Sequence, residues 1–290
     1  MPRSFIDKLA QGTRRFIPNI QKLITGTPPA NSWMHTFQFG PDTPAGTYPG
    51  AALAMQTITG GTSPSLSGGI VTVADPSGSS KQYITKSSIK NLVANGKGRI
   101  YLIDLLATYN GINTNSAVAQ NFTGSAAGAD IRPRTTNRRT QCFLDVTVAL
   151  GATASNVTLT YTKTVSLASG RSTGAQAMVT SAIVGRLPHN TLFLPLQAGD
   201  EGIASAQSII FSAAMLAGTA TLCLCDVLAV IDLGPTDQEP VVRSHITDPA
   251  SLIEIPTGAA LSYIWEPVSA TASQRIALTH EFSECDLTAA

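Results

Sequence analysis

Apolar and polar residues alternate through the middle of this chain. In residues 142–148, every second residue from Cys142 to Val148 is apolar, and Asp145 and Thr147 fall on the opposite face. Residues 157–161 repeat the alternation. A period of two between turn signals predicts half-buried antiparallel strands rather than helices.

Other segments extend this pattern in both directions. Residues 99–106 form a nearly continuous apolar run, which predicts a central strand or a buried strand with a bulge near Asp104. Residues 183–188 are ambiguous. Short helices are expected at residues 4–11 and 84–95. The remaining expected strands are 34–39, 51–58, 69–73, 203–211, 219–231, 257–265 and 275–282.

These elements predict an all-β fold, an antiparallel β-sandwich of jelly-roll type with an extended N-terminal arm and a C-terminal extension. Proline- and glycine-rich stretches suggest the boundaries. The expected parts are an arm (1–29), a strand-rich N-terminal region (30–98), a sandwich body (97–234) and an acidic extension (235–290).

The chain is unusually poor in charge. Charged residues make up 13% of it, against about 25% in average soluble domains. There are 34 Thr and 26 Ser, and the formal net charge is only +1. A polar but uncharged surface suits extensive contact with neighbours, although Thr is also simply common in strands. The balanced net charge gives no bulk attraction to nucleic acid or membrane.

The two ends of the chain differ in charge. Residues 1–25 hold five basic residues against one acidic residue, whereas residues 226–290 hold ten acidic residues against two basic ones. The arm has no core of its own, so we expect it to dock on another subunit or on a different protein. The arm residues expected to bind a partner are Phe5, Ile6, Leu9, Arg14, Arg15 and Phe16.

A compact basic cluster lies between the predicted strands of the body. It comprises Arg132, Arg134, Arg138 and Arg139. DNA is one candidate partner, but the cluster lacks interleaved aromatic residues for base stacking. We therefore favour an acidic protein surface as its partner, and nucleic acid is not expected.

The four cysteines do not form a metal-binding pattern. Cys223 and Cys225 share one face of a predicted strand, with no second pair and no nearby histidine, so free buried thiols are expected. Cys285 lies in the acidic tail and is expected to be accessible. Of the four cysteines it is the best candidate for an intersubunit disulfide, although we favour a free thiol.

Catalytic and cofactor motifs are not recognisable in the sequence. His35, His189, His245 and His280 are scattered, and no nucleophile elbow, zinc-protease or phosphate-loop motif occurs. A Ser-His-Asp triad assembles from distant residues, so motif search does not address it. Asp200 and Glu201 form either a Ca²⁺ site or, as we favour, an exposed acidic hairpin loop. We expect no enzymatic activity, metal or cofactor.

The middle of the chain resembles a diffuse family of tailed-bacteriophage virion proteins. Four segments carry the resemblance: residues 101–112 (YLIDLLATYNGI), 145–154 (DVTVALGATA), 157–161 (VTLTY) and 194–202 (LPLQAGDEG). They cover less than half of the chain. The likeness lies in the kind of strand and loop patterns and in their order along the chain. It carries over no active-site residues.

This resemblance implies a β-sandwich structural protein of a phage particle. The leading expectation is a capsid decoration or cement protein, located in the virion and assembled in the bacterial cytoplasm. It would bridge major capsid subunits as a homo-oligomer, with a trimer favoured. A neck, collar or tail component is the main alternative, and a host-surface or carbohydrate-binding module is a weaker one. No window is apolar enough for a membrane-spanning helix, so no membrane partner is expected.

Overall fold

The fold is all-β. The computed structural model describes residues 13–24, 32–38, 46–48, 50–58, 71–72, 76, 78, 80–91, 98–124, 139–232, 241–244, 252–267 and 274–285. Within these ranges the helical element is a three-residue 3-10 turn, η1 (Thr36–Gln38), and all ladders between named strands are antiparallel. The predicted all-β antiparallel class is confirmed.

A seven-stranded central sheet organises the molecule. Its order is β2 (Met34–His35), β16 (Ala260–Pro267), β6 (Gly98–Asn113), β13 (Thr219–Asp232) and β8 (Gln141–Val148). Two short strands, β3 (Met55–Thr57) and β4 (Val71–Thr72), pair with β6 and β16 respectively.

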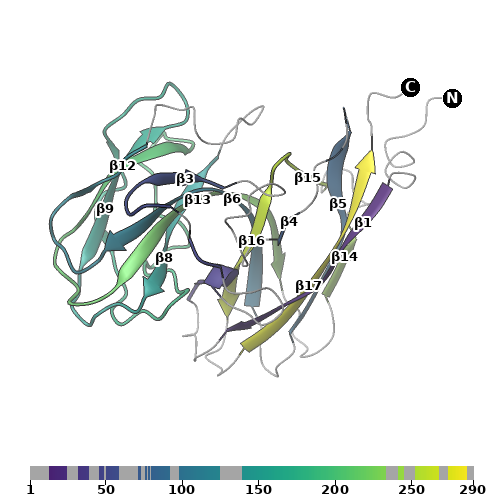
Figure 1. The fold of residues 1–290 in the computed structure, drawn as a ribbon, viewed down its shortest axis with the longest axis horizontal. Coiled ribbons are helices and arrows are strands. Elements are labelled where there is room, and N and C mark those ends of the chain that lie inside the picture. The colour runs from purple at the N-terminus through teal and green to yellow at the C-terminus, as the bar shows by residue number, and fades with distance from the viewer. Residues whose placement is uncertain are drawn as a thin grey trace.

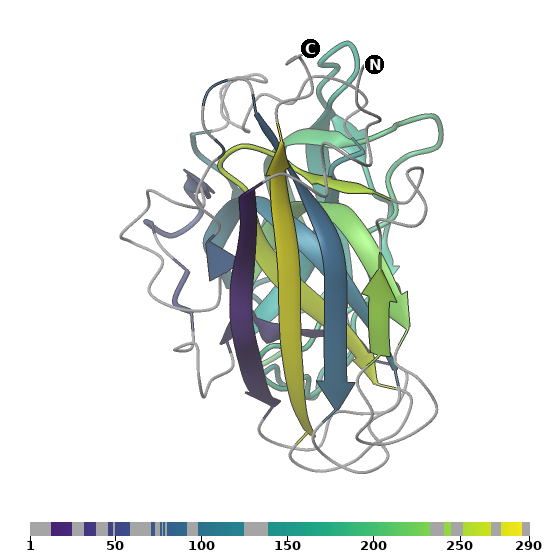
Figure 2. The same cartoon turned by 90° about the vertical axis from the view of Figure 1, so that its right-hand side faces the viewer.

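Two smaller sheets flank the central sheet on opposite sides (Figure 1). One runs in the order β10 (Arg171–Ser172), β9 (Asn156–Lys163), β12 (Ile203–Phe211) and β7 (Gln120–Asn121), with β11 (Gln176–Ala177) also paired to β9. The other runs in the order β1 (Thr13–Ile24), β17 (Gln274–Cys285), β5 (Lys81–Asn91) and β14 (Val241–Ser244), with β15 (Ile253–Ile255) on β5. Figure 2 shows β1, β17, β5 and β14 side by side.

The central sheet curls into a nearly closed barrel. Residues 185–187 join its two ends, because they hydrogen-bond to both β8 and the start of β2. On one side the Gly185 amide donates to Val146 O at 2.8 Å, and on the other the Leu187 amide donates to Trp33 O at 2.9 Å. The segment that the sequence left ambiguous therefore closes the barrel.

Three apolar cores follow from this arrangement. One fills the space between the central sheet and the β9–β12 sheet, and another lies between the central sheet and the β17–β5 sheet. The third lies inside the barrel. Strand β6 serves all three: Leu106 belongs to the first core, Leu102 to the second and Leu105 to the third. Burial on both faces explains its continuous apolar run.

The expected bulge near Asp104 is confirmed. Asp104 lies opposite Asp226 in the β6–β13 ladder, and register shifts occur on both sides of this pair. The Asp104 side chain is fully buried and accepts a hydrogen bond from the Ala260 amide at 2.9 Å. The acid is thus satisfied in part by the neighbouring strand.

The expected helix at residues 84–95 is wrong, because this segment contributes to strand β5. Ile84 and Ile89 both pack in the core beneath the β17–β5 sheet, although their spacing of five would separate them in a regular strand. A register shift between Ile84 and Lys86 corrects the parity. The bulge hides the period of two in the sequence.

The sheets also cross the expected part boundaries. Strand β16, from the acidic extension, is hydrogen-bonded between β2 and β6 of the central sheet. Arm strand β1 pairs with β17 over Thr13–Ile24, so Arg14, Arg15 and Phe16 lie opposite Ser283, Phe282 and Glu281. This part of the arm pairs with a strand of its own chain, and its expected docking on another subunit stays a prediction. Phe5, Ile6 and Leu9 lie outside the described residues.

Candidate functional site

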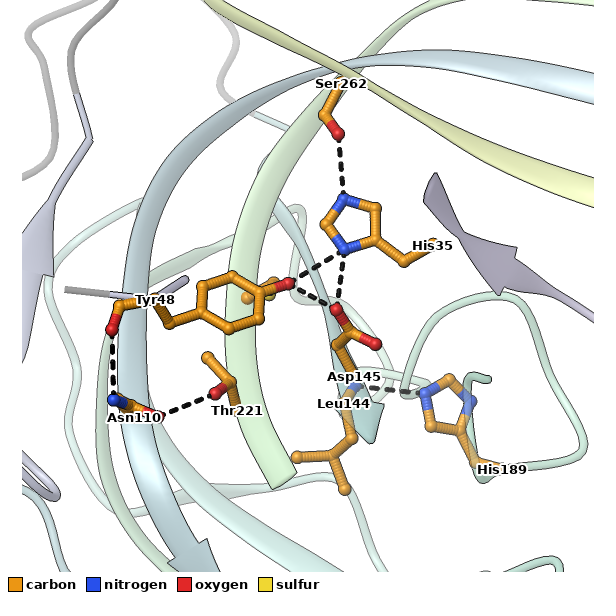
Figure 3. Close-up of polar contacts among 9 residues, drawn as sticks. His35, Tyr48, Asn110, Leu144, Asp145, His189, Thr221 and Ser262 are labelled. Atoms are coloured by element: carbon orange, nitrogen blue, oxygen red, sulfur yellow. Dashed lines mark hydrogen bonds and ion pairs between the residues drawn. The ribbon is translucent and has the colours of Figure 1, made fainter. Parts of the chain in front are cut away.

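A buried polar cluster inside the barrel is the main candidate site (Figure 3). His35 on β2 places its Nδ1 2.9 Å from Asp145 Oδ2 on β8, and its Nε2 lies 3.0 Å from Ser262 Oγ on β16. All three residues have no solvent exposure. A neutral imidazole that donates from Nδ1 to the carboxylate and accepts at Nε2 from the Ser262 hydroxyl satisfies these contacts.

Tyr48 completes the cluster. Its hydroxyl donates to Asp145 Oδ2 and lies 2.9 Å from His35 Nδ1. Burial, together with the nearby Asp145 carboxylate, raises the pKa of Tyr48 well above its usual value, so the phenol stays protonated. The Cys223 thiol also donates to the Tyr48 hydroxyl at 3.5 Å.

The segment carrying Tyr48 is held from both sides. The Tyr48 ring stacks on Phe37 with centroids 4.3 Å apart, and Asn110 Nδ2 donates to Tyr48 O at 3.2 Å. Asn110 is itself fixed by the Thr221 hydroxyl at 3.1 Å. A Cβ at Gly46 would lie 2.4 Å from the Phe37 ring, so only glycine fits there. These contacts lock Tyr48 into the barrel interior.

Barrel closure brings these residues together. Ser262 is next to β2 because Ile264 pairs with His35, whereas β8 stands at the far end of the strand order. In a flat sheet three strands would separate Asp145 from His35. Residues 185–187 bring β8 back to β2, and this allows the contact.

The cluster has the order of a Ser-His-Asp triad, but it is sealed. In such triads the serine attacks a substrate and the histidine takes its proton. Here the Ser262 side chain is completely buried, so no substrate reaches it in this conformation. What the arrangement does is tie four distant segments together by hydrogen bonds, with a carboxylate at the centre.

The sequence pattern did not single out this cluster. Asp145 was assigned to the polar face of a half-buried strand, but both faces of β8 are buried, and Phe143 also has no exposure. The one available signal was a carboxylate in an apolar strand, since such a group needs partners.

A second buried histidine supports the same strand. His189 Nε2 accepts a hydrogen bond from the Leu144 amide at 3.2 Å, and Nδ1 donates to Thr191 O. Burial lowers the pKa of His189 to about 4, so this imidazole is neutral at physiological pH.

Asp200 forms a separate cluster on the β9–β12 sheet. Its side chain has no exposure and is paired with Arg171 at 2.8 Å and Lys163 at 3.6 Å. The Tyr161 hydroxyl donates to the same carboxylate at 2.7 Å. These bonds, led by Arg171, lower the pKa of Asp200. Its carboxylate is thus fully engaged, which argues against the Ca²⁺ site. It also makes the expected exposed loop wrong for Asp200, although Glu201 is exposed.

Most predicted partner-binding residues are not brought together. Arg139 is exposed just before β8, and Arg132, Arg134 and Arg138 lie outside the described residues. The expected accessibility of Cys285 is wrong, because it is 5% exposed and packs with Tyr83 and Leu252. Pairing of β17 with β5 covers it. Cys142, Cys223 and Cys225 are buried and not in disulfides, as predicted.

The described residues contain no grouping of three or more His, Cys, Asp or Glu suited to a metal ion. Within the same part of the chain, no helix is long and apolar enough to cross a membrane.

Comparisons with known proteins give little further guidance. No protein-family model matches the chain, and no curated protein matches it. Among solved structures, a VP2 subviral particle of infectious bursal disease virus is 11% identical, with 97% of this chain and 83% of that chain covered and a TM-score of 0.18. The D431N mutant VP2 of the same virus gives 12% identity, coverage of 98% and 79%, and a TM-score of 0.19. Both likenesses to this viral capsid protein are weak, and scores this low carry no argument about function.

Proposed function

We propose that this protein is a non-enzymatic structural component of a virion, and more specifically a decoration or cement protein that bridges major capsid subunits of a tailed phage. One observation carries the proposal. The four segments that resemble phage virion proteins, far apart in sequence, assemble around a single core in this structure.

The assembly is direct. Residues 101–112 lie in β6, residues 145–154 cover the end of β8 and its following loop, and residues 157–161 lie in β9. Residues 194–202 lead into β12, and Leu194 packs in the same core as Leu106, Val146 and Leu159. The resemblance thus maps onto one two-layer body rather than onto scattered surface pieces.

The polar chemistry of the chain supports a structural role. An arrangement with the order of a hydrolytic triad is sealed inside the barrel, where Ser262, His35 and Asp145 are fully buried. Low overall charge favours broad protein contacts, since few ions need to be desolvated. Because Thr13–Ile24 pairs within the chain, we place the intersubunit contacts on the body.

The alternatives differ in what they require. A neck, collar or tail component would use the same fold in a ring. A carbohydrate-binding module would need exposed aromatic rings, but Trp265 is fully buried and the large exposed hydrophobic side chains of the described residues are all aliphatic. This observation favours the two structural roles over the binding module.

Copy number in particles tests the proposal. Particles made by the genome that encodes this chain should be purified, and the chain quantified against the major capsid protein on a stained gel. A decoration protein should appear in a fixed ratio comparable to the capsid lattice, whereas a single ring gives a far smaller ratio. Absence of the chain from purified particles would overturn the virion role altogether.

A further inference from the structure

One end of the sandwich body carries three neighbouring loops without charged residues. Three loops build this end, and we call them the neutral rim: residues 113–120, 147–155 and 212–219. None of them contains Asp, Glu, Lys, Arg or His, and neither do the flanking strand residues 110–112, 156–162 and 203–211. The absence of charged residues distinguishes the neutral rim from other parts of the surface, which carry charges.

The neutral rim exposes aliphatic side chains. Val118 is 73% exposed, Leu216 is 72% exposed and Val148 is 54% exposed. Six alanines are exposed around them: Ala117, Ala119, Ala149, Ala152, Ala154 and Ala217. The surface between them is Asn, Ser and Thr. Absence of charge together with exposed aliphatic groups is the composition expected at the centre of a protein–protein interface.

Hydrogen bonds hold the three loops together as one surface. The Met215 amide donates to Thr114 O at 3.0 Å, and the Gly151 amide donates to Ala217 O at 3.2 Å. The Thr114 hydroxyl donates to Ala217 O at 2.9 Å. The rim is therefore organised before any partner arrives, which lowers the entropy cost of binding.

Leu216 is held in a strained conformation. Its φ of 69° lies in the left-handed region, which β-carbon sterics disfavour for leucine. The turn packs closely on the neighbouring loop, because a Cβ at Gly151 would lie 1.7 Å from Met215 O. Leu216 thus presents a large apolar side chain to solvent from within the neutral rim.

We propose that the neutral rim is the surface through which one copy of this chain docks on a second copy. A charge-free face meets its own copy without opposing like charges, so self-contact carries no electrostatic penalty. A charged partner, such as nucleic acid or an acidic protein, would gain no ion pair there and would lose hydration. The proposal goes beyond the virion role, because it concerns the purified chain alone.

The opposite end of β9 provides a matched control. Leu167 also has a positive φ of 49° and is 46% exposed, but it lies in the loop after Lys163, near the Asp200–Arg171 ion pair. Leu167→Asn and Leu216→Asn therefore remove the same side chain from the same kind of backbone. Asparagine tolerates the left-handed region, so both variants should fold at least as well as the parent chain.

Sedimentation velocity of the full chain over a concentration series tests the proposal. The parent chain should form a species heavier than the 30.2 kDa monomer. Leu216→Asn should weaken association by about tenfold or more, and Val118→Lys should do the same by bringing like charges together at the contact. Leu167→Asn should associate like the parent chain.

The proposal requires both rim variants to weaken association and the control to leave it intact. It is overturned if either condition fails, or if the parent chain stays monomeric at every concentration. A monomeric chain that still occupies particles at high copy number would overturn this proposal and leave the virion role standing.

Discussion

Two carboxylates, Asp145 and Asp200, have side chains without solvent exposure but lie in different surroundings. Asp145 is inside the barrel, and its hydrogen-bonding partners His35 and Tyr48 come from segments far away in sequence. Asp200 lies at the edge of the β9–β12 sheet, and its partners Arg171 and Lys163 are cations that are 26% and 23% exposed.

The difference shows what each carboxylate does. Arg171 and Lys163 stay in contact with water, so solvent screens their attraction to Asp200. When one of these cations is removed, water can hydrate the carboxylate and offset part of the lost stability. Asp145 has no such replacement, because its surroundings exclude water and the cluster joins β2, β8 and the Tyr48 segment. We conclude that the interior cluster specifies the barrel, whereas the Asp200 cluster fixes one loop.

Removing the interior carboxylate should have the largest effect. Asp145→Ala leaves the buried His35 Nδ1 and the Tyr48 hydroxyl without their acceptor, and we expect a loss of about 3–5 kcal/mol in unfolding free energy. Urea unfolding followed by circular dichroism measures it. A loss no larger than that of Asp200→Ala would break the distinction between the two sites.

Acid should destabilise the interior before it affects the Asp200 cluster. His189 has a folded-state pKa of about 4, below its unfolded value near 6.5, so the unfolded chain binds its proton first. Its contribution is complete above pH 6.5 and is lost as the pH falls toward 4, a difference on the order of 3 kcal/mol. Unfolding free energy measured across this window should fall, and His189→Gln should flatten the profile. An unchanged slope in the variant would contradict the assignment.

Tyr48→Phe should have an intermediate effect. It keeps the ring stacked on Phe37 but removes the hydrogen bond to Asp145. We expect a loss of about 1–3 kcal/mol, because the carboxylate keeps only its His35 contact. Tyr161→Phe is the matched control, since it removes a phenol bonded to Asp200 instead. Equal losses in the two variants would show that the surroundings do not matter.

Arg171→Gln should have the smallest effect. The pKa of Asp200 is lowered in the folded state, mainly by Arg171, so its stabilising contribution is present at neutral pH and is lost as acid protonates the carboxylate. The variant should unfold at slightly lower urea than the parent at pH 7, and the two should converge as acid protonates the carboxylate. Added salt should reduce the difference, because the cations are partly exposed. A salt-independent difference larger than that of Tyr48→Phe would reverse the comparison.

The sequence predicted most strands because their outward and inward positions alternate. It failed where a local irregularity breaks the period, as in β5, whose bulge brings Ile84 and Ile89 to one face. It also failed where both faces are buried, as around Asp145 in β8. In both cases the burial of the side chains depends on contacts with other strands. The sequence of a single strand does not show those contacts.

The candidate site was beyond the reach of sequence patterns for a geometric reason. His35 is separated from Asp145 by 110 positions and from Ser262 by 227. No spacing rule joins such residues, and their meeting depends on residues 185–187, whose pattern is neither clearly a strand nor clearly a loop. The charge-free character of the neutral rim is present in the sequence, but its three loops become one surface only through the fold.

The most direct test of a sealed, structural Ser262–His35–Asp145 cluster is reaction of the native chain with a fluorophosphonate probe, read by intact mass and peptide mapping. We predict that Ser262 stays unmodified while the chain is folded, because its hydroxyl is buried and bonded to His35. A stoichiometric adduct on Ser262 in the folded protein, lost in His35→Gln, would show an accessible and activated serine. That result would contradict both the sealed barrel and the non-enzymatic role.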